Sequence, residues 1–121
     1  MNKHTVSLKL SKQMGKLGWE KETLFVWVKF KDYSPPLLYD PKDIASREKL
    51  GFVVENIYPA PIASEILEEL SDFVTVGKEP RTKGGKYYSD YIHKKDNPIT
   101  APTPAEALGK MWVYLKEEGL I

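Results

Sequence analysis

Residues 101–121 read Ala101-Pro-Thr-Pro-Ala-Glu-Ala-Leu-Gly-Lys-Met-Trp-Val-Tyr-Leu-Lys-Glu-Glu-Gly-Leu-Ile121, and they carry a full set of helix signals. Thr103 stands at the N-cap position, Pro104 at the first helical position, and Glu106 three residues after the cap. From there the carboxylate can reach back to the N–H of the cap. Apolar side chains then recur at spacings of three and four, as on one buried helix face: Leu108, Met111, Trp112 and Leu115. The sequence predicts a helix over 104–118 that packs this face into the core.

The end of this helix is also predicted. Gly119 can adopt the left-handed conformation that follows many helices, because it lacks a Cβ atom. Leu120 then stands where a Schellman motif places an apolar residue against the last helical turn, here against Leu115.

Three further helices are expected. The first spans 5–17, is capped by Ser7 or Thr5, and ends at Gly18. The second spans 41–50 after the cap-and-proline pair Asp40-Pro41 and ends at Gly51; its apolar side is thin, so it should lie on the surface. The third follows Pro59-Ala-Pro61 for about ten residues and is amphipathic.

Strands are predicted at 24–30, where β-branched and aromatic residues are concentrated, and at 73–76 and 86–93, which would form a hairpin. Residues 52–58 fit either a short strand or an extended loop. Pro35-Pro36 should interrupt any strand after 30, and 96–102 reads as a rigid connector. This order of elements predicts an α+β fold in a single domain over 1–121: an antiparallel sheet of three or four strands with helices packed on one face.

The composition predicts a soluble cytoplasmic protein. The chain has 121 residues, 18 Lys and Arg against 17 Asp and Glu, a net charge of +1 and no cysteine. The absence of cysteine excludes disulfides, thiolate metal sites and thiol catalysis. No apolar run approaches the roughly 20 residues of a membrane helix, and the first residues lack the apolar core of a signal peptide. No membrane association is expected.

Neither a catalytic nor a metal-binding constellation is visible. His4 and His93 have no partner at ligand spacing, which predicts no bound metal and no cofactor. Ser89, Asp90 and His93 resemble a triad only by proximity in sequence. In a strand Ser89 and His93 share one side while Asp90 points to the other, so we expect a polar strand face. The sequence thus favours a protein that is not an enzyme.

Residues 78–95 combine six basic side chains with two acidic ones, for a local net charge of +4, and include Tyr87, Tyr88 and Tyr91. Basic groups that neutralise phosphates and rings that stack on bases are typical of single-stranded nucleic-acid surfaces. Tyrosines are equally common in strands, and lysines protect exposed sheet edges. Nucleic-acid binding is therefore the alternative hypothesis, and its candidate residues are Arg81, Lys83, Lys86, Tyr88 and Lys94.

The first hypothesis is binding to a protein partner or self-association as a homo-oligomer. It depends on aromatic residues that exceed the needs of a small core: Trp19, Phe25, Trp27, Tyr33 and Tyr39.

Three blocks carry a family resemblance. They are Val6-Ser-Leu-Lys-Leu-Ser-Lys-Gln-Met-Gly-Lys-Leu-Gly18 with Glu22-Thr-Leu-Phe-Val-Trp27, then Tyr58-Pro-Ala-Pro-Ile-Ala-Ser-Glu-Ile-Leu67, then Thr103 to Ile121. In this order they resemble small uncharacterised proteins of bacteria, phages and prophages, which have an SLELAKKLKELG start, an APTxxEL middle and an ADALAKLLIWLxENG end. This chain departs from that pattern at Ile62-Ala63, where a threonine cap is usual, and in the insertion-like region 40–57. The resemblance implies a phage or prophage accessory protein and supplies no catalytic residue.

Overall fold

The computed structural model describes residues 4–70, 74–78, 87–91 and 98–121. Its elements follow in the order α1 (Leu8–Lys16), β1 (Val26–Phe30), β2 (Leu37–Tyr39), α2 (Pro41–Lys49), β3 (Val54–Pro59), α3 (Ala63–Glu69), β4 (Val74–Lys78), β5 (Tyr87–Tyr91), β6 (Ile99–Ala101) and α4 (Pro104–Glu117). The strands form two antiparallel sheets of three, in the orders β2-β1-β3 and β4-β5-β6. The predicted α+β class, with helices packed on antiparallel sheets, is confirmed.

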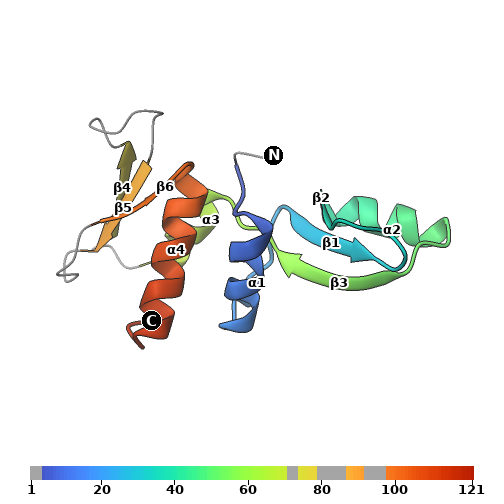
Figure 1. Cartoon of the computed structure of the whole chain (residues 1–121), viewed down its shortest axis with the longest axis horizontal. Coiled ribbons are helices and arrows are strands. Elements are labelled where there is room, and N and C mark those ends of the chain that lie inside the picture. The colour runs from blue at the N-terminus through green and yellow to red at the C-terminus, as the bar shows by residue number, and fades with distance from the viewer. Residues whose placement is uncertain (1–3, 71–73, 79–86, 92–97) are drawn as a thin grey trace.

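The strands divide between two separate sheets, whereas the sequence predicts a single layer. Figure 1 shows the two sheets at opposite ends of the molecule, with α1, α3 and α4 between them. Of residues 52–58, for which the sequence allows a strand or a loop, 54–58 belong to a strand, β3, and Phe52 and Val53 lie outside it. The prediction omits β2 and β6, since each has only three residues and directly follows prolines, which leaves too little pattern for detection.

Helix α4 begins and ends as predicted. The Thr103 side chain accepts a hydrogen bond from the Glu106 N–H at 3.2 Å. At the other end Gly119 has a φ of 70°, and both Schellman hydrogen bonds form: Gly119 N–H to the Lys116 carbonyl at 3.1 Å and Leu120 N–H to the Leu115 carbonyl at 2.8 Å. Local sequence signals are sufficient to predict both ends of α4, because each hydrogen bond there joins residues only a few positions apart.

Glu106 departs from its expected capping role. Its carboxylate accepts a hydrogen bond from the Ser7 N–H, at the N-cap of α1, instead of the N–H of Thr103. The negative charge therefore lies at the start of α1, where the partial positive charge of the helix dipole stabilises it. One side chain thus connects the beginnings of two helices that are distant in sequence.

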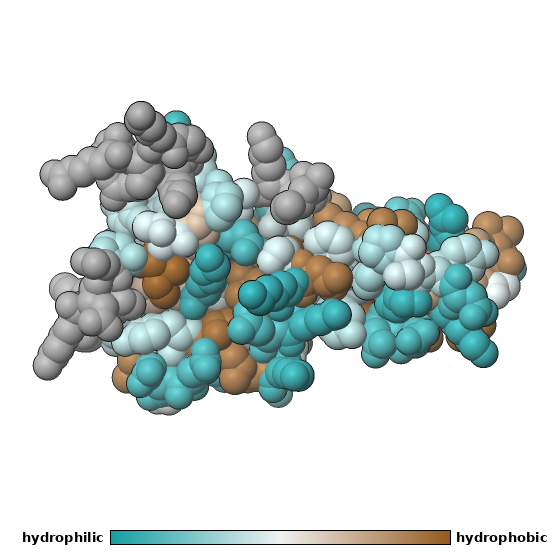
Figure 2. Space-filling view, in the orientation of Figure 1, coloured by the Kyte–Doolittle hydropathy of each residue, from teal (hydrophilic) through white to brown (hydrophobic). Residues whose placement is uncertain are grey.

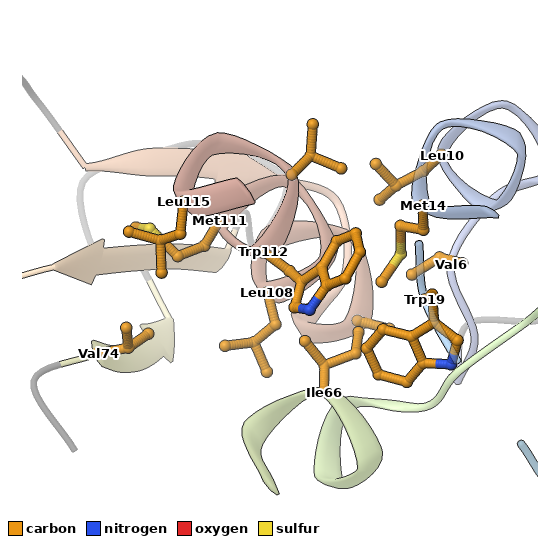
Figure 3. Close-up of a cluster of buried hydrophobic side chains, with 12 residues drawn as sticks. Val6, Leu10, Met14, Trp19, Ile66, Val74, Leu108, Met111, Trp112 and Leu115 are labelled. Carbon is orange, nitrogen blue, oxygen red and sulfur yellow. The ribbon is translucent and has the colours of Figure 1, made fainter. Parts of the chain in front are cut away.

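The main hydrophobic core lies around α4, which packs on β4–β6 on one side and on α1 and α3 on the other. Figure 3 shows Trp19 and Ile66 beside Trp112, while Met111 and Leu115 point toward the side of Val74. The rings of Trp19 and Trp112 meet edge to face, with centroids 5.4 Å apart. The predicted apolar face of α4 is confirmed as core. We call this region, made of α1, α3, α4 and β4–β6, the proximal unit.

Gly109 sets the distance between α1 and α4. A Cβ atom at this position would lie 2.6 Å from Leu10 Cδ2 and 2.9 Å from Val6 Cγ1, both closer than carbon atoms pack. Leu10 and Val6 are buried, so they have little room to retreat. The glycine is therefore a packing requirement in the middle of a helix, where it costs about 1 kcal/mol in propensity.

The remaining elements, β1, β2, α2 and β3, form a second region that we call the distal lobe (residues 26–59). Its core contains three buried side chains, Val28, Phe30 and Ile44, with half-buried neighbours packed around them. Phe30 contacts Tyr39 and Phe52 edge to face, with ring centroids 5.6 Å apart in both pairs. As predicted, α2 lies on the surface and buries only Ile44.

Backbone hydrogen bonds attach the distal lobe to the proximal unit. The Ala60 N–H donates to the Phe25 carbonyl at 3.2 Å, so the chain leaves and returns at adjacent points. The Val6 N–H donates to the Pro61 carbonyl at 3.2 Å, and the Ser11 hydroxyl donates to the Pro59 carbonyl. The indole N–H of Trp27 donates to the Val6 carbonyl at 3.1 Å. This junction is polar and directional.

Candidate protein-binding surface on the distal lobe

Large exposed hydrophobic residues are concentrated in the distal lobe. Nine such residues occur in the described part of the chain, and five of them belong to this lobe: Tyr33, Leu37, Leu50, Val53 and Ile57. We call these five residues the distal patch. The lobe therefore exposes more large apolar side chains than the three that it buries.

Strand register explains two members of the distal patch. Val28 pairs with Leu37 on one side and with Ile57 on the other, so the three side chains share one face of the sheet. Val28 is only 1% exposed, whereas Leu37 is 54% and Ile57 50% exposed. The small α2 helix cannot cover the full width of the sheet, and the outer strands keep their apolar side chains in solvent.

Two tight turns place the other three members at the tip of the lobe. Asp32, with a φ of 68°, reverses the chain after β1, and Gly51, with a φ of 95°, ends α2. Here the Schellman hydrogen bond from the Phe52 N–H to the Arg47 carbonyl, 3.2 Å long, turns Phe52 inward. Leu50, the residue before the glycine, is left 75% exposed.

The tip has an open surface hollow of about 430 Å³. It is lined by the two turns: Lys31, Asp32, Tyr33, Leu50, Gly51, Phe52 and Val53. Figure 2 shows hydrophobic surface at the corresponding end of the molecule, where α2 leads into β3. The lining of the hollow combines apolar side chains with one basic and one acidic side chain, Lys31 and Asp32. This composition suits the binding of an apolar side chain surrounded by polar contacts.

The edges of this sheet are poorly suited to accepting another strand. Strand β2 has three residues and follows Pro35-Pro36. In β3 the register shifts at Glu55, which forms a bulge, and its carboxylate lies 3.9 Å from Lys29 Nζ. Pro59 has no N–H, and its carbonyl is already bonded to Ser11. Bulges, prolines and charges discourage edge-to-edge pairing of strands. The apolar face of the sheet, and not its edges, is therefore the candidate contact surface.

The distal lobe is electrically balanced. Five basic side chains (Lys29, Lys31, Lys42, Arg47 and Lys49) accompany five acidic ones (Asp32, Asp40, Asp43, Glu48 and Glu55), so the formal net charge of residues 26–59 is zero. The Arg47 guanidinium lies over the rings of Phe52 and Tyr39, with its carbon 5.6 and 5.9 Å from their centroids. This cation–π contact stabilises the small core from outside.

The predicted set of surface aromatic residues is largely wrong. Trp19 is buried against Trp112 because it follows Gly18 in a Schellman ending of α1, which turns it into the core. Trp27 is half-buried at the junction, Phe25 is half-buried, and Tyr39 packs on Phe30. Tyr33 alone of the five is exposed. Sequence reasoning missed the aliphatic members of the patch: Leu37, Leu50, Val53 and Ile57.

The basic hairpin lies mostly outside the described residues, including Arg81, Lys83, Lys86, Lys94 and His93. The described part shows β4 and β5 paired antiparallel, with Lys78 opposite Tyr87. Tyr88 stands opposite Gly77, and a Cβ atom there would be 2.9 Å from the Tyr88 ring, so the ring covers the glycine. Ser89 is fully buried. Tyr88 therefore already has a packing role within the sheet.

Other chemistry in the described residues is limited. Among the residues that the structure describes, no three His, Asp or Glu side chains lie close enough together to hold a metal ion. The hydrogen bond and the charge of Glu69, 3.0 Å away, raise the pKa of exposed Lys21 above its ordinary value of 10.5. In the same part of the chain, every helix is too short or too polar to cross a bilayer.

Comparisons with models of protein families, with curated proteins and with solved structures find no match to this chain.

Proposed function

We propose that this chain is a binding protein without catalytic activity, and that the distal patch is its contact surface for protein. The observation that supports this proposal is the exposure of five large apolar residues on a lobe that buries three. Exposed apolar surface that a chain does not cover itself is characteristic of interaction sites.

The size of the patch fits this role. Large side chains exposed by half or more each present on the order of 100 Å², so the five offer about 500 Å² of apolar surface. At about 25 cal/mol per Å², covering it yields roughly 12 kcal/mol before the cost of association, which is about 4–15 kcal/mol. The patch alone supports association of weak to moderate affinity, and polar contacts at the rim would strengthen it.

A photo-cross-linking experiment tests the proposal. Tyr33 is replaced by p-benzoyl-phenylalanine in the full chain, and Leu120, which is similarly exposed on the proximal unit, is replaced in a matched control. We expect irradiation in cells to yield a cross-linked protein, identified by mass spectrometry, from position 33 and not from position 120. Equal yields at both positions, or none at position 33, would contradict the proposal.

The resemblance to phage and prophage proteins adds a setting to this proposal. We propose an accessory protein of that type which acts in the bacterial cytoplasm without a cofactor. The region that departs from the resemblance, 40–57, supplies α2 and most of β3, and with them three members of the distal patch. Neighbouring genes that belong to a phage would support this setting, and an isolated metabolic operon would argue against it.

Nucleic-acid binding through 78–95 is the second candidate. The antiparallel pairing of β4 and β5 supports a hairpin, and the local charge of six basic against two acidic residues supports contact with phosphates. We expect single-stranded binding that weakens with salt and that falls on changing Arg81, Lys83 and Lys86 to alanine. No binding at low salt, or no loss in the triple variant, would eliminate this candidate.

A further inference from the structure

We infer that the occupant of the distal patch is a second copy of this chain, and that two distal lobes pack face to face around a two-fold axis. This inference rests on the proposed function, because it names the partner for the same surface. It commits to a symmetric dimer in which the same residues contribute from both copies.

The available area is the first argument. A stable interface of ordinary size buries about 800 Å² on each partner, of which somewhat more than half is apolar. The distal patch offers about 500 Å² of apolar surface, of which Tyr33, Leu50 and Val53 at the tip present about 300 Å², and Lys31 and Asp32 lie beside these three in the hollow. One copy of the patch therefore matches, in area and in composition, what a second copy requires.

The charge distribution is the second argument. In a two-fold interface every surface charge meets the same surface rotated, so an excess of one sign would repel itself. Residues 26–59 carry equal numbers of basic and acidic side chains, and the hollow itself is lined by one of each, Lys31 and Asp32. A nucleic acid or a strongly acidic protein would instead be expected to select a surplus of positive charge.

The shape of the tip is the third argument. The hollow of about 430 Å³ is larger than one leucine side chain, and Leu50, exposed by 75%, stands at its border. Each copy thus presents both an apolar projection and a hollow to receive one, as a self-complementary surface requires. The blunted edges of β2 and β3 direct this contact to the face of the sheet instead of to strand addition.

Sedimentation equilibrium of the full chain, from nanomolar to submillimolar concentration, tests the inference. We expect a reversible monomer–dimer equilibrium for the natural sequence. Leu50→Asp should raise the dimer dissociation constant by about 100-fold or more, because a symmetric interface contains the substitution twice and each charge loses its hydration on burial. Val53→Asp should act in the same direction, and the matched control Leu120→Asp should leave the constant within about threefold.

Circular dichroism of each variant confirms that it is folded, which these exposed positions favour. A natural protein that stays monomeric across the range overturns the inference, and so does a dimer that Leu120→Asp weakens while Leu50→Asp and Val53→Asp do not. Cross-linking at position 33 separates this inference from the broader proposal. A product of twice the chain mass supports the second copy. If the only product is a cross-link to a different protein, the inference of a second copy is overturned but the binding function is kept. The absence of any cross-linked product contradicts both.

Discussion

The proximal unit and the distal lobe solve the problem of burying apolar surface in different ways. The proximal unit surrounds α4 on both sides and assembles a cluster of twelve buried residues. The distal lobe covers a three-stranded sheet with one short helix, buries three residues, and relies on aromatic contacts and on Arg47. The first region is thus closely packed on both sides of its central helix, whereas the second leaves five large apolar side chains exposed.

The strongest test of this contrast removes volume from the proximal core. Leu115 has 0% exposure, so Leu115→Ala should leave a cavity and lower the free energy of unfolding by about 3–5 kcal/mol. Urea denaturation followed by circular dichroism measures the change. A loss below about 1 kcal/mol would mean that the proximal unit is not the tightly packed region.

A smaller loss is expected from overpacking the contact between α1 and α4. Gly109→Ala gains about 1 kcal/mol in helix propensity, but its Cβ atom pushes Leu10 and Val6 away from α4. We expect a net destabilisation of about 1–2 kcal/mol. The double variant with Leu10→Ala provides the control, because removing the Leu10 side chain removes the closer of the two contacts and should reduce the penalty of the alanine at 109. An unchanged penalty in the Leu10→Ala background would contradict this explanation.

The distal lobe should respond less, and locally. Ile44→Ala empties part of a core that lies near solvent and can collapse, so we expect a loss of about 1–2 kcal/mol. Hydrogen exchange should accelerate in β1–β3 while the amides of α4 stay protected. If 1–121 form one domain, as proposed, global unfolding remains a single transition. Equal acceleration in α4 would contradict the contrast between the two regions.

The smallest effect concerns the ion pair of Lys21 with Glu69. The folded state raises the pKa of Lys21 above 10.5, so its contribution to stability is present below pH 10.5 and is lost as the pH rises through the folded-state pKa. Lys21→Met should therefore be slightly less stable than the natural chain at pH 8, and as stable as the natural chain at a pH above the folded-state pKa of Lys21. Denaturant midpoints of both proteins, at pH 8 and above that pKa, measure the difference. A difference that persists at high pH would exclude the ion pair as its cause.

Sequence reasoning succeeded where partners are close in the chain. Gly18, Gly51 and Gly119 mark helix ends correctly, because the Schellman hydrogen bonds connect residues five or fewer positions apart. It failed where the partner is remote: Glu106 bonds a residue 99 positions away, and the division into two sheets depends on which strands meet. For the candidate site, the sequence predicts Tyr33 as surface. Leu37 and Ile57 follow only from register and from the narrow cover of α2, and Leu50 and Val53 follow from the two turns at the tip.

The junction has a consequence for how such a chain can vary. Phe25 and Ala60 are hydrogen-bonded neighbours, and Trp27 and Pro59 beside them make further junction bonds, so the part of the lobe beyond these residues is attached through two adjacent strands. A segment whose ends already meet can be shortened, enlarged or exchanged without moving the attachment points, and tolerated insertions are found at such places. The distal lobe can then change in size and surface while the proximal unit keeps its shape.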